Sequence, residues 1–227
     1  MKKFFLILAF CLSLSSVVMA QNVQLVNDLG IQEDELEMVQ NRIGEKVDDF
    51  QRYLQDLAGR GDLSHETKMK RYDLTLKLFI GEGKPYPAEI PNPYGGFTQK
   101  MHEAVKMQTI NSKYNKKRSS YPMTVYLTNL IKRSEEPNYK YKQIVIEAAA
   151  AVRVDNFSKV GEGRYSATAH ILQHFVGYGK DGVRIQYEDY TAKTITVYIN
   201  RIEIDTPEGR DYYWEILLGD VDCDDIW

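Results

Sequence analysis

Residues 139–222 contain long runs in which apolar and polar residues alternate, and these runs limit what the chain can fold into. Alternation with a period of two is typical of antiparallel strands that have one face on a hydrophobic core. The sequence therefore predicts a meander of four long strands, with a β-bulge near Asn200–Arg201, where the apolar positions change phase. The positions expected to face the core are Ile144, Ile146, Ala148, Ala150, Val152 and Val154 in the first run, Tyr165, Ala167, Ala169, Ile171 and Phe175 in the second, Ile195, Val197 and Ile199 in the third, and Tyr212, Trp214, Ile216 and Leu218 in the fourth.

Alanines cluster on the expected core face of the first two strands. A turn at residues 159–163 would place Val154 opposite Tyr165, and antiparallel register would then place Ala150 opposite Ala169. Small residues that face each other either admit a closely packed helix or leave a hollow, and we expect close packing because protein cores fill to high density. In the second case Ala150 and Ala169 would line a ligand pocket.

Three segments outside the meander have helical periodicity. Residues 33–58 carry apolar residues three or four positions apart, and residues 64–80 and 122–133 show similar spacing over shorter lengths. The acidic residues Glu33–Glu35 suit the positive end of the first helix dipole. We therefore expect an α+β fold in which N-terminal helices pack on a strongly curved antiparallel sheet.

Residues 81–96 are rich in proline and glycine and have no periodicity, so composition predicts a loop. Long loops in compact domains often carry function, which makes Tyr86, Tyr94 and Phe97 candidates for the rim of a binding site. The alternative, which we favour, is that these aromatic side chains pin the loop to the domain surface.

The N-terminal residues have the pattern of a secretory signal peptide, with Lys2 and Lys3 before an apolar run and Ala20 at the expected cleavage site. A lipoprotein signal acylated at Cys11 is the alternative, but bulky Phe10 stands where a small residue is preferred. We expect residues 1–20 to be removed, residues 21–227 to form one domain, and the protein to be exported to the periplasm, the cell envelope or the medium.

Charge and hydropathy exclude some partners. The formal net charge is −3, and nucleic-acid binding needs clustered positive charge, so we expect no nucleic-acid partner. After the signal, no apolar segment approaches the length of a membrane span. Cys223 would be the only thiol of the mature chain, and we expect it to be a half-buried strand residue.

Candidate metal and acid–base motifs fail on spacing, so we predict neither a metal site nor a cofactor. His170 and His174 lie four positions apart on one strand, too far to share a metal, and on the face expected to point outward. Asp220, Asp222 and Asp224 resemble the start of a calcium loop without its later ligands, which favours a solvated acidic tail. The strand assignments place no Asp or His inside the fold.

The order of helices and strands, closed by the strand at Trp214–Asp220, resembles the cystatin-like α+β cone of the nuclear transport factor 2-like superfamily. The likeness covers about residues 31–222. Signal, loop and meander together also resemble uncharacterised secreted proteins of Bacteroidetes. The superfamily includes isomerases, dehydratases and noncatalytic binding domains, so the resemblance implies a fold and a cavity between helices and sheet but no particular chemistry. It also implies that interior aromatic residues would line that cavity, namely Tyr126, Tyr165, Tyr212 and Trp214.

The function expected from these observations is that of an exported, noncatalytic binding or interaction module for a small molecule or an envelope protein. The alternative is an isomerase or dehydratase that uses the cavity, and a buried carboxylate or histidine there would separate the two. A third possibility is a structural envelope protein that forms a homodimer through the outer face of the sheet.

Overall fold

The protein has an α+β fold, as the sequence predicts, with three α-helices, a seven-stranded sheet and a separate two-stranded sheet in the part of the chain that is described. The structure is a computed structural model, and it describes residues 29–59, 61, 63–91, 97–110, 116–207 and 209–226. Within these ranges no helix is long and apolar enough to cross a membrane. The predicted signal peptide lies outside the described residues.

The elements follow one another along the chain in this order. The first part contains α2 (Glu33–Ala58), α3 (His65–Leu76), the short 3₁₀ helix η1 (Ile80–Gly83), β1 (Tyr86–Pro91), β2 (Phe97–His102), β3 (Lys106–Ile110), β4 (Arg118–Pro122) and α4 (Met123–Glu135). The second part contains β5 (Gln143–Ala148), β6 (Arg153–Gly161), β7 (Arg164–Tyr178), β8 (Ile185–Thr206) and β9 (Gly209–Ile226). One helix thus follows four strands, so the helices are N-terminal only in part.

The large sheet is mixed rather than wholly antiparallel. Its order is β4-β3-β9-β8-β7-β5, and β6 also pairs with β7. The neighbours β7, β8 and β9 form the predicted antiparallel meander, whereas β3 runs parallel to β9, with Met107 opposite Val221. The sequence does not predict β4, because its five residues are mostly exposed and carry no alternating apolar pattern.

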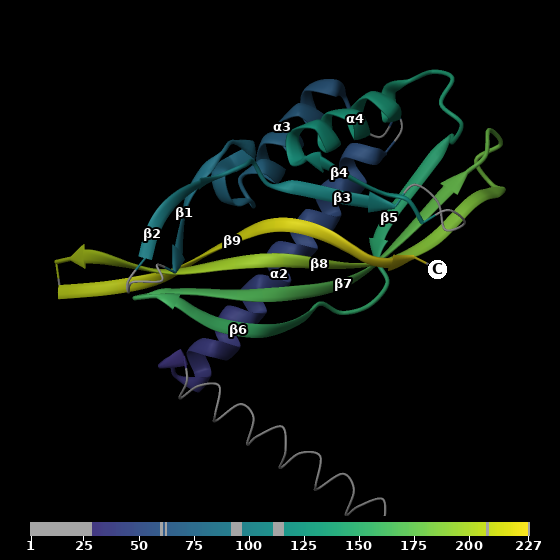
Figure 1. Ribbon diagram of the computed structural model, residues 1–227. Helices are drawn as coiled ribbons and strands as arrows, with labels where there is room; N and C mark the ends of the chain where they lie inside the picture. The colour runs from purple at the N-terminus through teal and green to yellow at the C-terminus, as the bar shows by residue number, and fades with distance from the viewer. Residues whose placement is uncertain are drawn as a thin grey trace, which may run out of the picture.

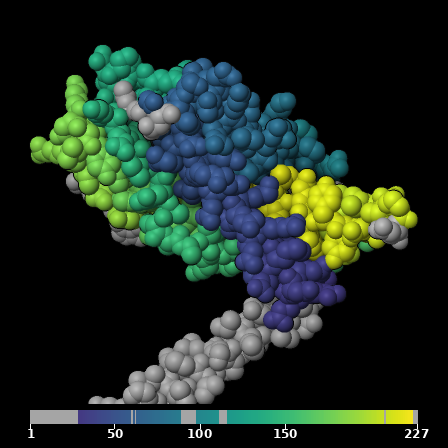
Figure 2. Space-filling view, turned by 180° about the vertical axis from the view of Figure 1, so that it is seen from behind, coloured from purple at the N-terminus to yellow at the C-terminus, as the bar shows by residue number. Residues whose placement is uncertain are grey.

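The helix α2 covers one face of the sheet. It spans the range that its periodicity predicts, and it runs obliquely across the strands, with α3 and α4 beside its C-terminal half (Figure 1). Seen from the opposite side, α2 forms a band across the molecular surface, with β9 on one side of it (Figure 2). The fully buried Phe50 meets Phe79 edge to face, with ring centroids 5.0 Å apart. Burial of one such side chain contributes about 1.5–3 kcal/mol to the stability of the fold. The apolar stripe of α2 is therefore what holds this helix on the sheet.

The first alternating run forms two strands instead of one. It breaks at residues 149–152, and β5 and β6 pair with different halves of β7. Alanine has a low preference for strands and little side chain to pack, which accounts for a break in a run of alanines.

The predicted register across the first turn is wrong. Tyr165 lies opposite Lys159, and Val154 lies opposite Ala169, because the chain turns at residues 162–163, with Gly161 opposite Arg164, instead of across residues 159–163. Ala150 is exposed in the break between β5 and β6, whereas Ala169 is fully buried on β7. The expected pair of facing alanines, and any hollow between them, is therefore not formed.

Two other predictions also need correction. No bulge occurs near Asn200–Arg201, since β8 and β9 keep one register from Val197 to Thr206; the irregularities lie at Ala192/Lys193 and Ile195/Val197. Residues 81–96 are not a continuous loop, because η1 and β1 occupy much of the segment and β1 pairs with β2. A two-stranded sheet leaves free edges on which the prolines of β1 can be accommodated, so composition alone is misleading there.

Candidate functional site

A cavity of about 280 Å³ lies beneath α4, and we call it the α4 cavity. Residues from α4, from six strands of the large sheet and from the link between α4 and β5 line it. They are Thr109, Ile110, Tyr121, Tyr126, Asn129, Leu130, Arg133, Tyr139, Lys140, Tyr141, Ile144, Ile146, Gln173, Phe175, Tyr187, Asp189, Thr191, Lys193 and Cys223. Arg133, Lys140 and Tyr121 are also exposed to solvent, so they belong to its rim.

The floor of the cavity is a polar stretch of β8. The inward face of β8 is apolar at Ile195, Val197 and Ile199. The same alternation continues toward the start of the strand with polar residues, at Lys193, Thr191 and Asp189. These three polar residues are only 4%, 8% and 7% exposed. Buried polar groups cost free energy unless they are paired. A cluster of them beside a cavity is therefore better explained by binding than by packing of the core.

Lys193 is the most unusual member of this cluster. Burial lowers the pKa of its amine, an effect that the nearby Cys223 and Asp189 oppose. Among the residues that the structure describes, none accepts a hydrogen bond from its Nζ or forms an ion pair with it. The side chain lines the cavity, so its amine is available to whatever fills that space.

Cys223 lies beside Lys193 but is not prepared as a nucleophile. The two residues are opposite each other on β9 and β8. The thiol donates a hydrogen bond to the carbonyl oxygen of Gln108 at 2.9 Å. Burial raises its pKa, and since the thiolate is the reactive form, the thiol is held in its unreactive state. The expected half-buried strand cysteine is in fact fully buried.

One wall of the cavity is a chain of aromatic rings. Tyr139 meets Tyr141, Tyr141 meets Phe175, and Phe175 meets Tyr187, with centroids 5.7, 6.1 and 5.9 Å apart. Successive rings are edge to face, the arrangement that aromatic pairs prefer. The backbone of Gly177 makes room for Tyr141, because a Cβ atom there would lie 2.7 Å from the tyrosine ring. This wall offers a flat apolar surface to a bound molecule.

Positive charge predominates around the cavity. Arg133, Lys140 and Lys193 face a single carboxylate, Asp189, which accepts a hydrogen bond of 3.4 Å from the hydroxyl of Thr191. Burial raises the pKa of Tyr126 to about 12, so its hydroxyl is neutral at physiological pH. The cavity thus combines apolar walls, neutral donors and an excess of cations.

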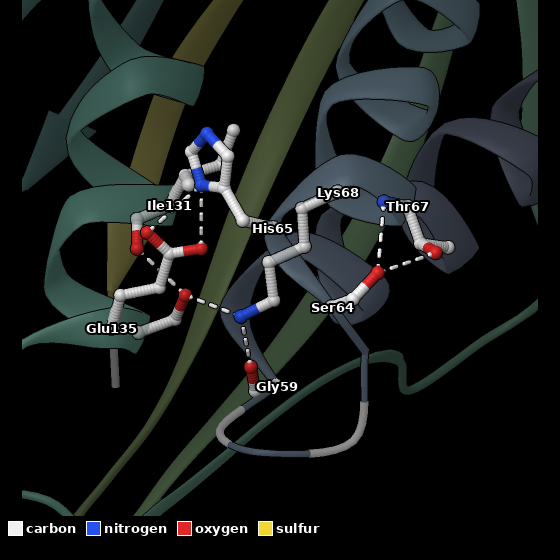
Figure 3. Close-up of polar contacts among 8 residues, drawn as sticks. Gly59, Ser64, His65, Thr67, Lys68, Ile131 and Glu135 are labelled. Carbon is white, nitrogen blue, oxygen red and sulfur yellow. Dashed lines mark hydrogen bonds and ion pairs between the residues drawn. The ribbon is translucent and has the colours of Figure 1, made fainter.

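A second buried lysine has a structural role instead. Lys68 on α3 is 1% exposed, and its Nζ donates to the carbonyl oxygen of Gly59 and to the hydroxyl of Ser134, both at 2.6 Å (Figure 3). Gly59 is at the C-terminal end of α2 and Ser134 is on α4, so one ammonium group joins three helices. A cation is favourable at this negative end of the α2 dipole.

His170 and His174, which the sequence places on the outward face of their strand, do not line the cavity. His174 hydrogen-bonds to Glu147 and Glu188 and stacks on Tyr190, while His170 contacts Asp155. The described residues contain no group of histidines, cysteines and carboxylates suited to a metal ion.

Of the residues predicted to bind a ligand, the four whose side chains are described, Tyr86, Ala150, Ala169 and Trp214, do not line the α4 cavity. Tyr86 is buried and its hydroxyl lies 3.2 Å from that of Tyr198, as expected if it pins the segment to the domain. Tyr94 and the side chain of Phe97 lie outside the described residues. Trp214 is buried between Tyr165 and Tyr212 in the core, and Ala150 and Ala169 are placed as described above.

The polarity of Asp189, Thr191 and Lys193 gives no sign in the sequence that these floor residues are buried. Their positions nevertheless continue the period-two pattern of β8 back from Ile195. The expectation that no Asp is inside the fold is therefore wrong, since Asp189 is buried on this face. Of the aromatic residues that the family resemblance implies, Tyr126 alone lines the cavity.

Comparison of the chain with protein-family models, with curated proteins and with solved structures gives no significant match.

Proposed function

We propose that the protein is a noncatalytic binding module that holds a small organic molecule in the α4 cavity. The observation that carries the proposal is the buried polar floor at Asp189, Thr191 and Lys193 beneath aromatic walls. Ligand pockets combine apolar or aromatic surface with placed polar groups that fix orientation. This cavity has both, with aromatic rings on one wall and polar side chains on its floor and rim. Its volume of about 280 Å³ suits a molecule of about one or two rings.

The setting that we propose for this activity comes from the sequence. The signal-like residues 1–20 support export to the periplasm or cell envelope, and the element order supports a curved, cone-like sheet of the nuclear transport factor 2-like kind. In such a cone a ligand lies between helix and sheet, as the α4 cavity does.

A second candidate function is proton-transfer catalysis of the isomerase or dehydratase type. Asp189 favours it, because a buried carboxylate in a cavity is the group that such a reaction needs. Solvent-deuterium exchange distinguishes the two functions. A catalytic base would exchange C–H protons next to the carbonyl of a bound ketone in D₂O, and an Asp189→Asn variant would lose that exchange. A binding module would bind the ketone without exchange.

The binding proposal is tested by a fluorine-NMR screen of small aromatic compounds against three proteins. The wild type should broaden the signals of some compounds. Asn129→Trp places a large side chain at a half-exposed lining position on α4 and should abolish this broadening. Val125→Trp, one turn earlier on α4 at an exposed position that does not line the cavity, is the matched control and should bind as the wild type does. Equal binding by all three proteins would overturn the proposal.

A further inference from the structure

We infer that the ligand of the α4 cavity is an anion, a small aromatic or unsaturated carboxylate or a similar acid, whose charged group pairs with Lys193. This inference rests on the proposed function and names the chemical class of the ligand.

The first argument is the state of Lys193 itself. A buried ammonium group is strongly unfavourable unless it is paired and hydrogen-bonded. The other buried lysine, Lys68, satisfies this rule with two hydrogen bonds, whereas Lys193 has no such partner among the described residues. A ligand carboxylate would supply the missing acceptor in the place where the amine meets the cavity.

The second argument is the balance of charge. The lining contains three cationic side chains, Arg133, Lys140 and Lys193, against one carboxylate, Asp189. Among the described residues, the rest of the lining contains no further carboxylate and no histidine. An anion would be attracted to this space and a cation would be repelled from it.

The third argument concerns alternatives. Covalent capture by the thiol is disfavoured, because the Cys223 Sγ–H is engaged with the Gln108 carbonyl group. A neutral ligand could use the aromatic wall, but it would leave the Lys193 amine without an acceptor of matching charge. An acid with a flat body uses both the wall and the amine.

The test compares two probes of nearly the same shape, 4-(trifluoromethyl)benzoate and 4-(trifluoromethyl)benzamide, by fluorine NMR titration at neutral pH. The wild type should bind the benzoate at least about tenfold more tightly than the amide, since a charge-assisted hydrogen bond is the stronger kind. Lys193→Met should remove this preference by weakening the benzoate alone. Lys140→Met, at the exposed rim, should retain most of it.

The outcomes separate this inference from the proposed function. Equal affinity for the two probes, or a benzoate preference that survives in Lys193→Met, overturns the anion inference while leaving the binding module intact. Absence of benzoate binding at millimolar concentration also overturns it. If the wild type broadens the fluorine signal of no compound in the screen, the binding module is overturned as well. A thermal unfolding curve for Lys193→Met confirms that the variant is folded.

Discussion

Lys193 on β8 lies directly opposite Cys223 on β9, and both side chains are buried at the floor of the α4 cavity. This pair lies where the apolar inward face of β8 becomes polar. A lysine in such a place reduces the stability of the empty protein, and stability is often lost where a site is built for function.

Replacement of Lys193 by methionine should therefore stabilise the unliganded protein. Methionine fills a similar volume without a buried charge. A buried donor that lacks an acceptor costs about 1–3 kcal/mol, so we expect a gain of that order. Urea unfolding should give a higher midpoint for Lys193→Met than for the wild type, with the same slope. A clearly lower midpoint would mean that Lys193 has a stabilising partner.

Replacement of Lys68 by methionine should have the opposite effect. The substitution is the same, but it removes two hydrogen bonds from a buried charge and leaves Gly59 and Ser134 without their partner. We expect the free energy of unfolding to fall by about 3 kcal/mol. Lys70→Met, which removes only an exposed ion pair with Glu66 on the same helix, should change it by less than about 0.5 kcal/mol. Similar losses in the two variants would contradict the role given to Lys68.

Gly177→Ala should disturb the aromatic wall. The new methyl group would lie 2.7 Å from the Tyr141 ring, so the ring must move. Overpacking of this kind costs about 1–3 kcal/mol, and ligand affinity should fall with it. Gly44→Ala in α2 is the control, because the space around that position is open and alanine is the better helix former. Chemical unfolding should show a gain of up to about 1 kcal/mol for Gly44→Ala and a loss for Gly177→Ala; the reverse order would refute this description.

His174 should make stability depend on pH. Burial lowers the pKa of its imidazole, but hydrogen bonds and charge from Glu147 and Glu188 outweigh burial, and the net pKa is raised above the usual value of about 6.5. A raised folded-state pKa means that the protonated form stabilises the fold. This contribution is complete below about pH 6.5 and is lost as the pH rises through the folded-state pKa. His174→Gln should therefore lower the urea midpoint more at pH 5.5 than at pH 8.5. A difference that is the same at both pH values would exclude this linkage.

The elements that the sequence predicts well are those with a sustained apolar period. The stripe from Leu36 to Leu57 defines α2, and the alternation at Ile195–Ile199 defines the inward face of β8. The sequence does not predict the hairpin of β1 and β2, because the prolines of β1 favour a loop. Local pattern also could not reveal that β5 and β6 share one neighbour, β7.

The site was harder to predict than the fold for a physical reason. A cavity exists where side chains fail to fill space, and this depends on which elements meet. The floor at Asp189–Lys193 continues the alternating pattern of β8, but its residues are polar, and polar residues are not expected in a core. Only the arrangement of α4 above β8 shows that these polar groups face inward.

The most direct test of the central claim is a crystal structure of the wild-type protein soaked with 4-(trifluoromethyl)benzoate. The account predicts electron density for the probe in the α4 cavity, with its carboxylate within hydrogen-bonding distance of Lys193 Nζ and its ring against Tyr141 or Tyr187. Density for the probe only at another place, or an empty α4 cavity at saturating concentration, would contradict it.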